Sequence, residues 1–384
     1  MKNLILIFIL FIMVGCRENK QSADKFISVD VTAKYPEKEL VLQDFMDVEY
    51  IPLETNDEFI CQGLVMAIGK DIILARNYIN DGVLFVFDRK TGKGIKKINR
   101  KGQGGEEYTF IQRVVLDEDK KEIFIHDHFA KKIVVYDLDG NFKRSLKHDD
   151  DLYFAHIYDF DRDNLICNNY WVTDRESFMI VSKQDGSIIQ KIQIPFDRKI
   201  LMDVSTKDES KNMTYSVVPR TYYPIISTPN GYVLVEQSSD TVYQYHFDHS
   251  IVPILVRTPV IRSMDPEVFL FLSIITDHYY FMETVKKEYD FSSGSGFFGK
   301  NLMYDTQKKA IFEYKVYNDD YSEKRVVNMK TNPVNKEIAS WQSMEISQLI
   351  TDHRKGKLKG QLMEIASQLD EESNPVIMLI KHKK

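Results

Sequence analysis

Three glycines within four positions, in RKGQGGEEYT (100–109), are the first feature that could carry chemistry. Glycine clusters often cradle phosphates, because backbone N–H groups can approach the ligand closely. This cluster lacks the Gly-Lys-Ser/Thr ending of a P-loop and does not match G-x-G-x-x-G. It also does not open a helix within a βαβ unit. We therefore predict a sharp turn between two strands here, and no nucleotide site.

Two histidines in IFIHDHF (123–129) form the second candidate. In a strand, His126 and His128 point to one face and Asp127 to the other. Two imidazoles so spaced can share a metal ion, but the sequence shows no recognisable third ligand. A structural role, a metal site and a plain surface position all remain open for this pair, and no metal site is predicted.

Other catalytic patterns are weak. Serine nucleophiles of the G-x-S-x-G type do not occur. Oxygen-bearing side chains are plentiful, but their spacing does not single out a calcium cage; examples are Glu106, Asp117, Asp159, Asn169 and Glu236. We therefore predict no cofactor and no catalytic residue, and calcium remains an alternative.

The N-terminus indicates export. MKNLILIFILFIMVGC has a lysine at position 2 and an apolar run too short to span a bilayer, which fits a signal peptide over residues 1–15. Its ending resembles a bacterial lipobox, which predicts lipid attachment at Cys16 and a polar tether over 16–25. An ordinary signal peptide cleaved elsewhere is the alternative. The expected location is the cell envelope, at the outer membrane. A net charge of −6 argues against nucleic acid as the main partner.

Short apolar strands separated by turn residues dominate the rest of the chain. The clearest hairpins are 83–98, 132–146 and 177–194, and weaker copies follow at 241–256 and 300–316. The turns of the first three begin at Asp88, Asp137 and Lys183, which are 49 and 46 residues apart. A period of that size, filled with strands, is typical of β-propeller blades.

The predicted fold is all-β: a six-bladed β-propeller over residues 26–384. The expected blades are approximately 47–98, 99–146, 147–194, 195–257, 258–316 and 317–384. Strands from the two termini should close the ring and protect the free edges; the candidates are 26–31 and 374–383. Apolar spacing predicts one helix at 357–372, and Asp265-Pro266 suggests another at 264–275. Whether Cys61 and Cys167 pair is left open.

The series 95–146 resembles an NHL-type blade. More narrowly, the chain resembles the six-bladed propeller lipoproteins of Bacteroidota over residues 40–384. The matching motifs are VEYIPLET (48–55), the glycine-rich junction before Tyr108, and NPV followed by a terminal strand. Relatives often carry Pro-Gly where this chain has Gly105. The resemblance implies that Asp127 hydrogen-bonds the backbone near its strand end.

Six-bladed propellers in general present ligands at the mouth of the central channel. This expectation selects Arg113, His156, Arg220, Tyr222, Tyr223 and His278. Cationic and aromatic groups at one opening suit an anionic or sugar-like ligand, although ordinary packing is the alternative for each. Phe297 and Phe298, between glycines, form either a partner-binding loop or an inserted turn packed on the blade.

These features favour a lipid-anchored binding or scaffolding module for an envelope protein or a small ligand. One alternative is a sugar- or lactone-directed enzyme at the channel mouth, which calcium would assist. Another is an accessory subunit of an outer-membrane nutrient-uptake assembly.

Overall fold

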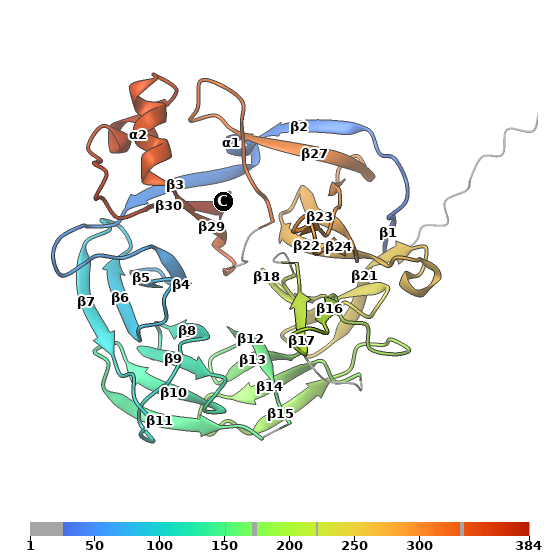
Figure 1. The fold of residues 1–384 in the computed structure, drawn as a ribbon, viewed down its shortest axis with the longest axis horizontal. Coiled ribbons are helices and arrows are strands. Elements are labelled where there is room, and N and C mark those ends of the chain that lie inside the picture. Colours follow the sequence, from blue (N-terminus) through green and yellow to red (C-terminus); the bar gives the residue numbers. More distant parts are fainter. Residues whose placement is uncertain (1–25, 150, 171–174, 220–221, 331–333, 384) are drawn as a thin grey trace, which may run out of the picture.

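A computed structural model describes residues 26–149, 151–170, 175–219, 222–330 and 334–383. These residues form six blades, each a β-sheet of three to six strands, arranged in a ring around a common axis (Figure 1). The predicted six-bladed propeller is therefore confirmed. Among the described residues, no helix has the length and apolar character needed to cross a membrane.

The first three blades are regular four-stranded antiparallel meanders, in which the first strand is innermost. Blade one contains β4 (Leu64–Ile68), β5 (Ile72–Arg76), β6 (Val83–Asp88) and β7 (Gly94–Asn99). Blade two contains β8 (Arg113–Asp117), β9 (Glu122–Asp127), β10 (Lys132–Asp137) and β11 (Phe142–Lys147). Blade three contains β12 (Phe154–Asp159), β13 (Asn164–Asn169), β14 (Phe178–Ser182) and β15 (Ile188–Ile192).

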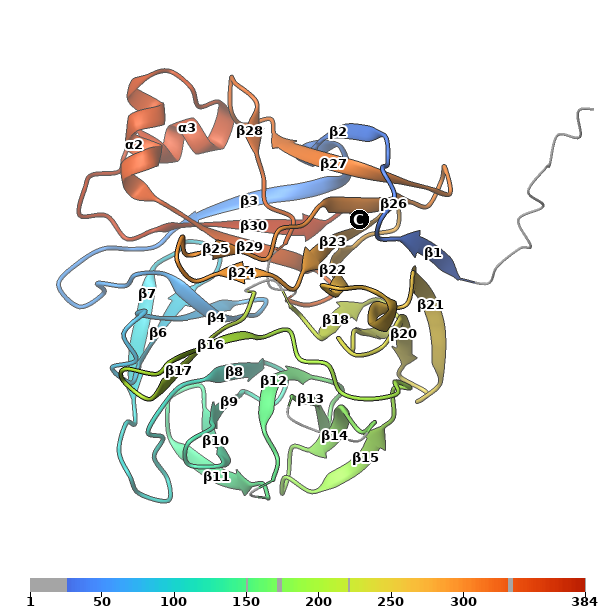
Figure 2. The ribbon, with the colours of Figure 1, turned by 45° about the vertical axis from the view of Figure 1, so that its right-hand side comes forward.

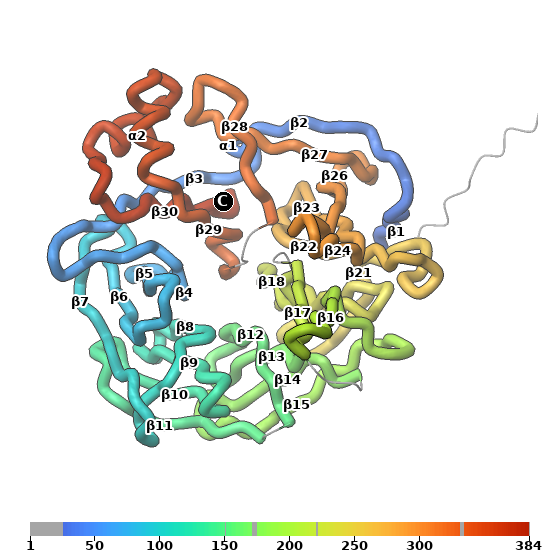
Figure 3. The backbone as a smooth tube through the Cα atoms, viewed as in Figure 1, coloured from blue at the N-terminus to red at the C-terminus, as the bar shows by residue number. Residues whose placement is uncertain are grey.

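Blades four and five each gain an outer strand from the N-terminal segment. Blade four has β18 (Ile225–Thr228), β19 (Gly231–Leu234), β20 (Thr241–His246) and β21 (Ile251–Thr258), and β1 (Ile27–Asp30) pairs with β21 in parallel. Blade five has β22 (Val268–Ile275), β23 (Tyr279–Lys286), β26 (Asn301–Asp305) and β27 (Ala310–Asn318). The strand β2 (Glu37–Val41) pairs with β27 in parallel, and the short β28 (Arg325–Val326) pairs with it antiparallel. Figure 3 shows the N-terminal segment running along the outside of these blades.

Blade six closes the ring with strands from both ends of the chain. Its order is β29 (Ile338–Met344), β30 (Val376–His382) and β3 (Met46–Pro52), and β30 lies between the other two. The predicted closure by terminal strands is correct, but the N-terminal contribution is β3. The segment 26–31 instead extends blade four. The expected first blade, 47–98, therefore begins too early, because Met46–Pro52 belongs to the last blade.

All five predicted hairpins form the outer strand pairs of blades one to five. The helix predicted at 357–372 is present as α3 (Gly360–Ala366), which follows α2 (Ile346–Arg354); α1 (Leu42–Phe45) is a single turn, and Ile261–Ser263 is a 3₁₀ turn. The helix predicted at 264–275 is wrong, because most of that segment is β22. Its apolar residues are buried at nearly every position, as in a strand covered on both faces.

Six apolar clusters hold the ring together, one between each pair of neighbouring blades. Alternate residues of a strand enter opposite clusters: in β14, Phe178 and Ile180 face blade four, whereas Met179 and Val181 face blade two. This alternation explains why the inner strands are apolar at successive positions. Cys61 and Cys167 are both buried and free, so they do not pair.

The two faces of the ring differ. One face is formed by the blade-to-blade connections and by the connections between the second and third strands of each blade. We call it the hairpin face. It carries two inserted hairpins, β16–β17 (Val204–Asp208, Met213–Val217) and β24–β25 (Tyr289–Asp290, Ser295–Gly296), and the segment of α2 and α3 (Figure 2). The opposite, C-terminal face holds the remaining turns and the end of β30.

The glycine-rich segment 100–109 is a blade-to-blade connection, as predicted. Gly102 N–H donates to Tyr108 O at 2.9 Å, and a β-carbon at Gly102 would collide with the Glu107 carboxylate. Tyr108 is fully buried and its hydroxyl donates to Gly82 O at 2.7 Å. Backbone groups of this loop are thus taken up by the protein itself, which fits a structural turn.

Asp127 fixes the same connection to blade two. Its Oδ2 accepts hydrogen bonds from the Thr109 N–H at 2.5 Å and hydroxyl at 2.8 Å, and its Oδ1 accepts from Ala130 N–H at 3.0 Å. The aspartate therefore holds the backbone near its strand end, as the family resemblance implied. Burial alone would raise its pKa, but these hydrogen bonds lower the pKa below its ordinary value.

Replacing this aspartate, Asp127→Asn, should lower the free energy of unfolding by about 2–3 kcal/mol at pH 7, because charge-assisted bonds to buried N–H groups are lost. A carboxylate whose pKa is lower in the folded than in the unfolded protein stabilises the fold at pH values above its unfolded-state pKa. This stabilisation is lost as the pH falls through the folded-state pKa. The difference from wild type should therefore shrink below about pH 4 in urea titrations. The exposed Asp139→Asn serves as the control. An equal effect of both substitutions would contradict this role.

Candidate functional site

The channel mouth on the hairpin face collects three of the six predicted ligand-binding residues. Arg113 begins β8, His156 is the third residue of β12, and Tyr223 lies two residues before β18. Each of these strands is the innermost of its blade and starts at the hairpin face (Figure 1). The charge of Arg113 acts on both of the other side chains, which places the three in one neighbourhood.

Arg113 is a cation that uses few of its hydrogen-bond donors within the protein. Its Nε donates to Ala155 O in blade three at 3.1 Å, and this bond aims the guanidinium across the blade boundary. No acceptor or carboxylate among the described residues pairs with its terminal nitrogens. An arginine whose terminal N–H groups are unpaired can bind a carboxylate or a similar anion through two parallel hydrogen bonds.

Aromatic side chains surround this cation. The rings of His156 and Tyr158, two residues apart on β12, lie within 3° of parallel with centroids 6.4 Å apart. Both side chains are only partly buried, and that of Tyr158 also packs against the apolar cluster between blades three and four. Tyr223 is also only partly buried.

Burial keeps these groups neutral. It lowers the pKa of His156 well below its usual value, and the Arg113 charge lowers this pKa further. Burial raises the pKa of Tyr158 to about 12, against the opposing effect of Arg113, and raises that of Tyr223. At neutral pH the mouth therefore presents a neutral imidazole and two protonated phenols, each able to donate and accept hydrogen bonds.

A second charged group near the mouth is an ion pair of blade five. Glu283 on β23 is 8% exposed and meets Lys330 with a Nζ–Oε1 distance of 2.6 Å. Its charge also acts on Tyr223, which places the pair near the mouth. Since Lys330 already neutralises Glu283, this carboxylate does not cancel the charge of Arg113.

The structure separates the other predicted residues from this group. Tyr222 packs against Phe271 at 5.1 Å and its hydroxyl donates to Val235 O at 2.8 Å, so it is part of the core between blades four and five. His278 lies in the β22–β23 turn on the C-terminal face, where its Nδ1 is 3.2 Å from Gln307 Nε2. The position expected for it is therefore wrong, because a first-to-second-strand turn lies opposite the blade connections. Arg220 and Cys16 lie outside the described residues.

The two phenylalanines of the inserted loop have different environments. Phe297 packs on Tyr289 with ring centroids 5.6 Å apart and joins the core between blades four and five. Phe298 is 64% exposed on the hairpin face.

The two histidines of blade two differ in burial: His126 is buried and His128 is partly buried. His126 is 1% exposed, its ring centroid lies 5.7 Å from that of the tilted His148 ring, and burial is the main cause that lowers its pKa to about 3. His128 packs on Tyr153 at 4.1 Å. Within the described part of the chain, no group of three or more His, Cys, Asp or Glu side chains is placed to hold a metal ion.

Sequence reasoning missed Tyr158, Glu283 and Lys330. Tyr158 could have been found from its spacing, because it lies two residues after His156 on the same strand. Glu283 and Lys330 lie far apart in the sequence, and nothing in their local sequence indicates that they meet.

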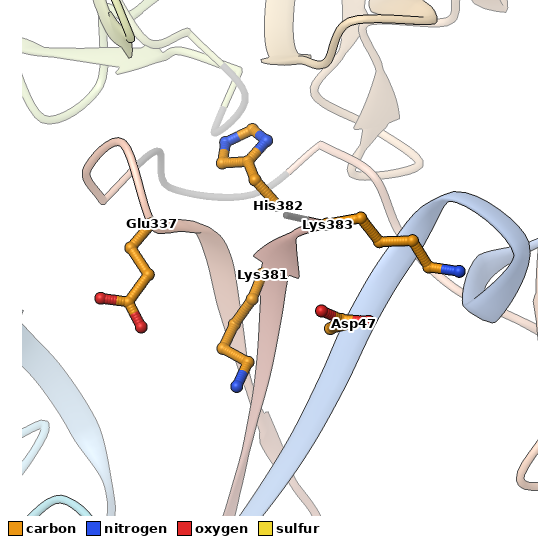
Figure 4. A pocket seen from close by; sticks show the side chains of 5 residues that line it. All are labelled: Asp47, Glu337, Lys381, His382 and Lys383. Atoms are coloured by element: carbon orange, nitrogen blue, oxygen red, sulfur yellow. The ribbon is translucent and has the colours of Figure 1, made fainter.

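The C-terminal face has a recess of its own. It has a volume of about 430 Å³ and is lined by Asp47, Glu337, Lys381, His382 and Lys383 (Figure 4). Lys381 binds Glu49 at 2.9 Å, and Arg89 reaches Glu337 at 3.2 Å. Two of the lining charges, Lys381 and Glu337, are thus paired with residues outside the recess.

The chain belongs to the family described as "6-bladed beta-propeller" (DUF5128), whose model matches residues 17–339. No protein of curated function matches the chain. Its fold is similar to the crystal structure of a protein described as exported, from Bacteroides fragilis, with a TM-score of 0.59 and 16% identity over 94% of this chain and 100% of that one.

Two further solved structures are more distant in shape. A member of the DUF4221 family from Bacteroides vulgatus has a TM-score of 0.40 at 9% identity, covering 88% of this chain and 98% of that one. Virginiamycin B lyase from Staphylococcus aureus has a TM-score of 0.36 at 10% identity, covering 70% of this chain and 88% of that one. Neither likeness is close enough to bear on function.

Proposed function

We propose that the protein is an exported, lipid-anchored binding module that uses its hairpin face to hold a protein partner in the cell envelope. The signal-like residues 1–15 and Cys16 support export and anchoring. The description of the Bacteroides fragilis neighbour as exported agrees with this location.

One observation carries the proposal: most of the large exposed apolar side chains of the described residues belong to connections and insertions of the hairpin face. On the opposite face, Phe247 is exposed in a turn, and exposed apolar side chains also stand at the starts of the outer strands β7, β15 and β21: Ile95, Ile189, Ile251 and Val252. The hairpin face exposes Ile60, Tyr78, Ile79, Phe129, Met213, Tyr215, Val218, Val260, Phe298 and Met363. Exposed apolar side chains rimmed by polar residues are typical of protein interaction surfaces.

The connections that carry these side chains are fixed to one another. Gln62 Oε1 accepts from Tyr78 N–H at 2.8 Å, which joins the loop of Ile60 to that of Ile79. The ring of Phe110 meets that of Phe129 edge-on at 5.3 Å. A preorganised surface loses little conformational entropy when a partner binds.

Photo-crosslinking in intact cells tests this function. A photoreactive residue replaces Ile79, which is 77% exposed on the hairpin face, in the full chain with a C-terminal tag. The tag lies on the opposite face. We expect one dominant envelope protein crosslinked in near-equal amount.

The matched control places the same photoreactive residue at Asp139, in an exposed turn on the C-terminal face. It should give no such product. Equal yields from both positions, or no defined protein from Ile79, would refute the hairpin face as the contact surface.

A further inference from the structure

We propose that the channel mouth binds a sugar acid, that is, a hydroxyl-rich ligand with a single carboxylate, between Arg113, His156, Tyr158 and Tyr223. The inference rests on the proposed function in one respect, because the site opens at the centre of the face assigned to binding. It adds a small-molecule ligand to a surface otherwise assigned to a protein.

The charge of the site specifies one anionic group. Arg113 keeps its terminal nitrogens free of described partners, whereas Lys330 is paired with a carboxylate and Arg76 uses Nη1 on backbone carbonyls while its Nε has no partner. Lys330 pairs with Glu283 at 2.6 Å, and Arg76 donates from Nη1 to Asn77 O at 2.7 Å and to Tyr78 O at 3.3 Å. A polyphosphate would need several free cations, so a single carboxylate on the Arg113 fork fits better.

The remaining polar groups specify hydroxyls. The imidazole of His156 and the phenols of Tyr158 and Tyr223 accept and donate no hydrogen bond among the described residues, and all three side chains keep accessible surface. A neutral imidazole has one donor and one acceptor nitrogen, and a phenol can do both. Ligand hydroxyl groups match this set, because they also donate and accept.

The aromatic rings supply the apolar contact. The parallel rings of His156 and Tyr158 offer flat surfaces beside the cation. The face of a pyranose ring can pack on such a surface while its hydroxyls reach the polar edges. A site that combines one free cation, flat rings and amphoteric hydroxyls therefore selects a cyclic sugar acid over a neutral sugar or an apolar carboxylate.

Titration calorimetry of the full-length protein tests the site with three probes. Glucuronate has the carboxylate and the hydroxyls, glucose lacks the carboxylate, and benzoate lacks the hydroxyls. We expect glucuronate to bind at least about tenfold more tightly than glucose or benzoate. Glucose cannot make the charge-assisted hydrogen bonds and benzoate cannot make the hydroxyl hydrogen bonds, so each leaves polar groups of the protein unpaired.

Variants link the binding to the named residues. Arg113→Gln should weaken glucuronate binding by about 10- to 100-fold, because the charge-assisted bonds are lost. Arg262→Gln, a matched control on the same face that is paired with Asp197 at 3.1 Å, should leave it unchanged. Should Arg113→Gln fail to fold, Tyr158→Phe replaces it: the ring stays, and glucuronate binding should weaken while benzoate binding stays the same.

Several results would overturn the proposal. Equal affinity for glucose and glucuronate would refute recognition of the carboxylate, and equal affinity for benzoate would refute recognition of the hydroxyls. Absence of binding by all three probes would also overturn it. Crosslinking through Ile79 would still succeed in that case if the hairpin face binds a protein, so the two proposals can fail separately.

Discussion

Removal of residues 376–384 is expected to prevent the chain from forming a stable ring. This truncation deletes β30, which pairs with β29 on one side and with β3 on the other. Its side chains enter two interblade clusters: Ile377 and Leu379 face blade one, and Val376, Met378 and Ile380 face blade five. Burial of an aliphatic side chain contributes about 1.5–3 kcal/mol, so five of them approach the whole stability of a typical domain.

Thermal unfolding followed by near-ultraviolet circular dichroism measures this effect. The truncated chain should show no cooperative transition, whereas removal of residues 383–384 alone should leave the melting temperature within a few degrees of wild type. The substitution Leu379→Ala should be intermediate, with a loss of about 2–5 kcal/mol. A truncated chain that still melts cooperatively would show that the ring does not depend on closure through β30.

Replacement of Lys183 by methionine is expected to be the most damaging single charge removal. Lys183 is 1% exposed, and its Nζ lies 2.6 Å from both Asp117 Oδ2 and Asp159 Oδ1 and 2.8 Å from Asp161 O. Burial alone would lower the pKa of Lys183, but the two carboxylates raise it above its ordinary value. Without the lysine, the 6% exposed Asp117 becomes a buried charge without a cation, at a cost of about 3–5 kcal/mol.

Urea denaturation at pH 7 quantifies this cost. The matched control is Lys120→Met, which removes a more exposed lysine paired with Asp163 in the same region and should cost about 1 kcal/mol or less. If Asp117→Asn is combined with Lys183→Met, part of the stability should return, because the unpaired carboxylate is gone. A loss below about 1 kcal/mol for Lys183→Met would contradict the assigned role.

The regular part of the fold was predictable because local sequence specifies it. Outer hairpins such as Val83–Asp88 with Gly94–Asn99 combine alternating strands with a glycine turn, and both signals lie within one short window. The strand β22 was not recognisable, because a run that is apolar at every position but Ser273 fits a buried helix as well as a strand covered on both faces. The partner of β30 also could not be read locally, since β3 lies more than 300 residues away.

The channel mouth was predictable only in part, for a similar reason. The general position of propeller sites led to Arg113, His156 and Tyr223, which lie within the first three residues of inner strands or two residues before one. It failed for His278, because the face on which a turn lies depends on the strand order within the blade. The pairing of Lys330 with Glu283 neutralises a carboxylate near the mouth, and only the folded ring shows it.

The parallel pairing of β1 with β21 also determines how the ring would respond to force. A pull on the N-terminal segment acts along β1, so it loads all the hydrogen bonds between β1 and β21 at once, in shear. A pull perpendicular to the strand would instead break these bonds one at a time. The next resistance is the parallel pairing of β2 with β27. Tension from an anchor at Cys16 would thus be borne by the outer edges of blades four and five before it reached β3, the strand that keeps the ring closed.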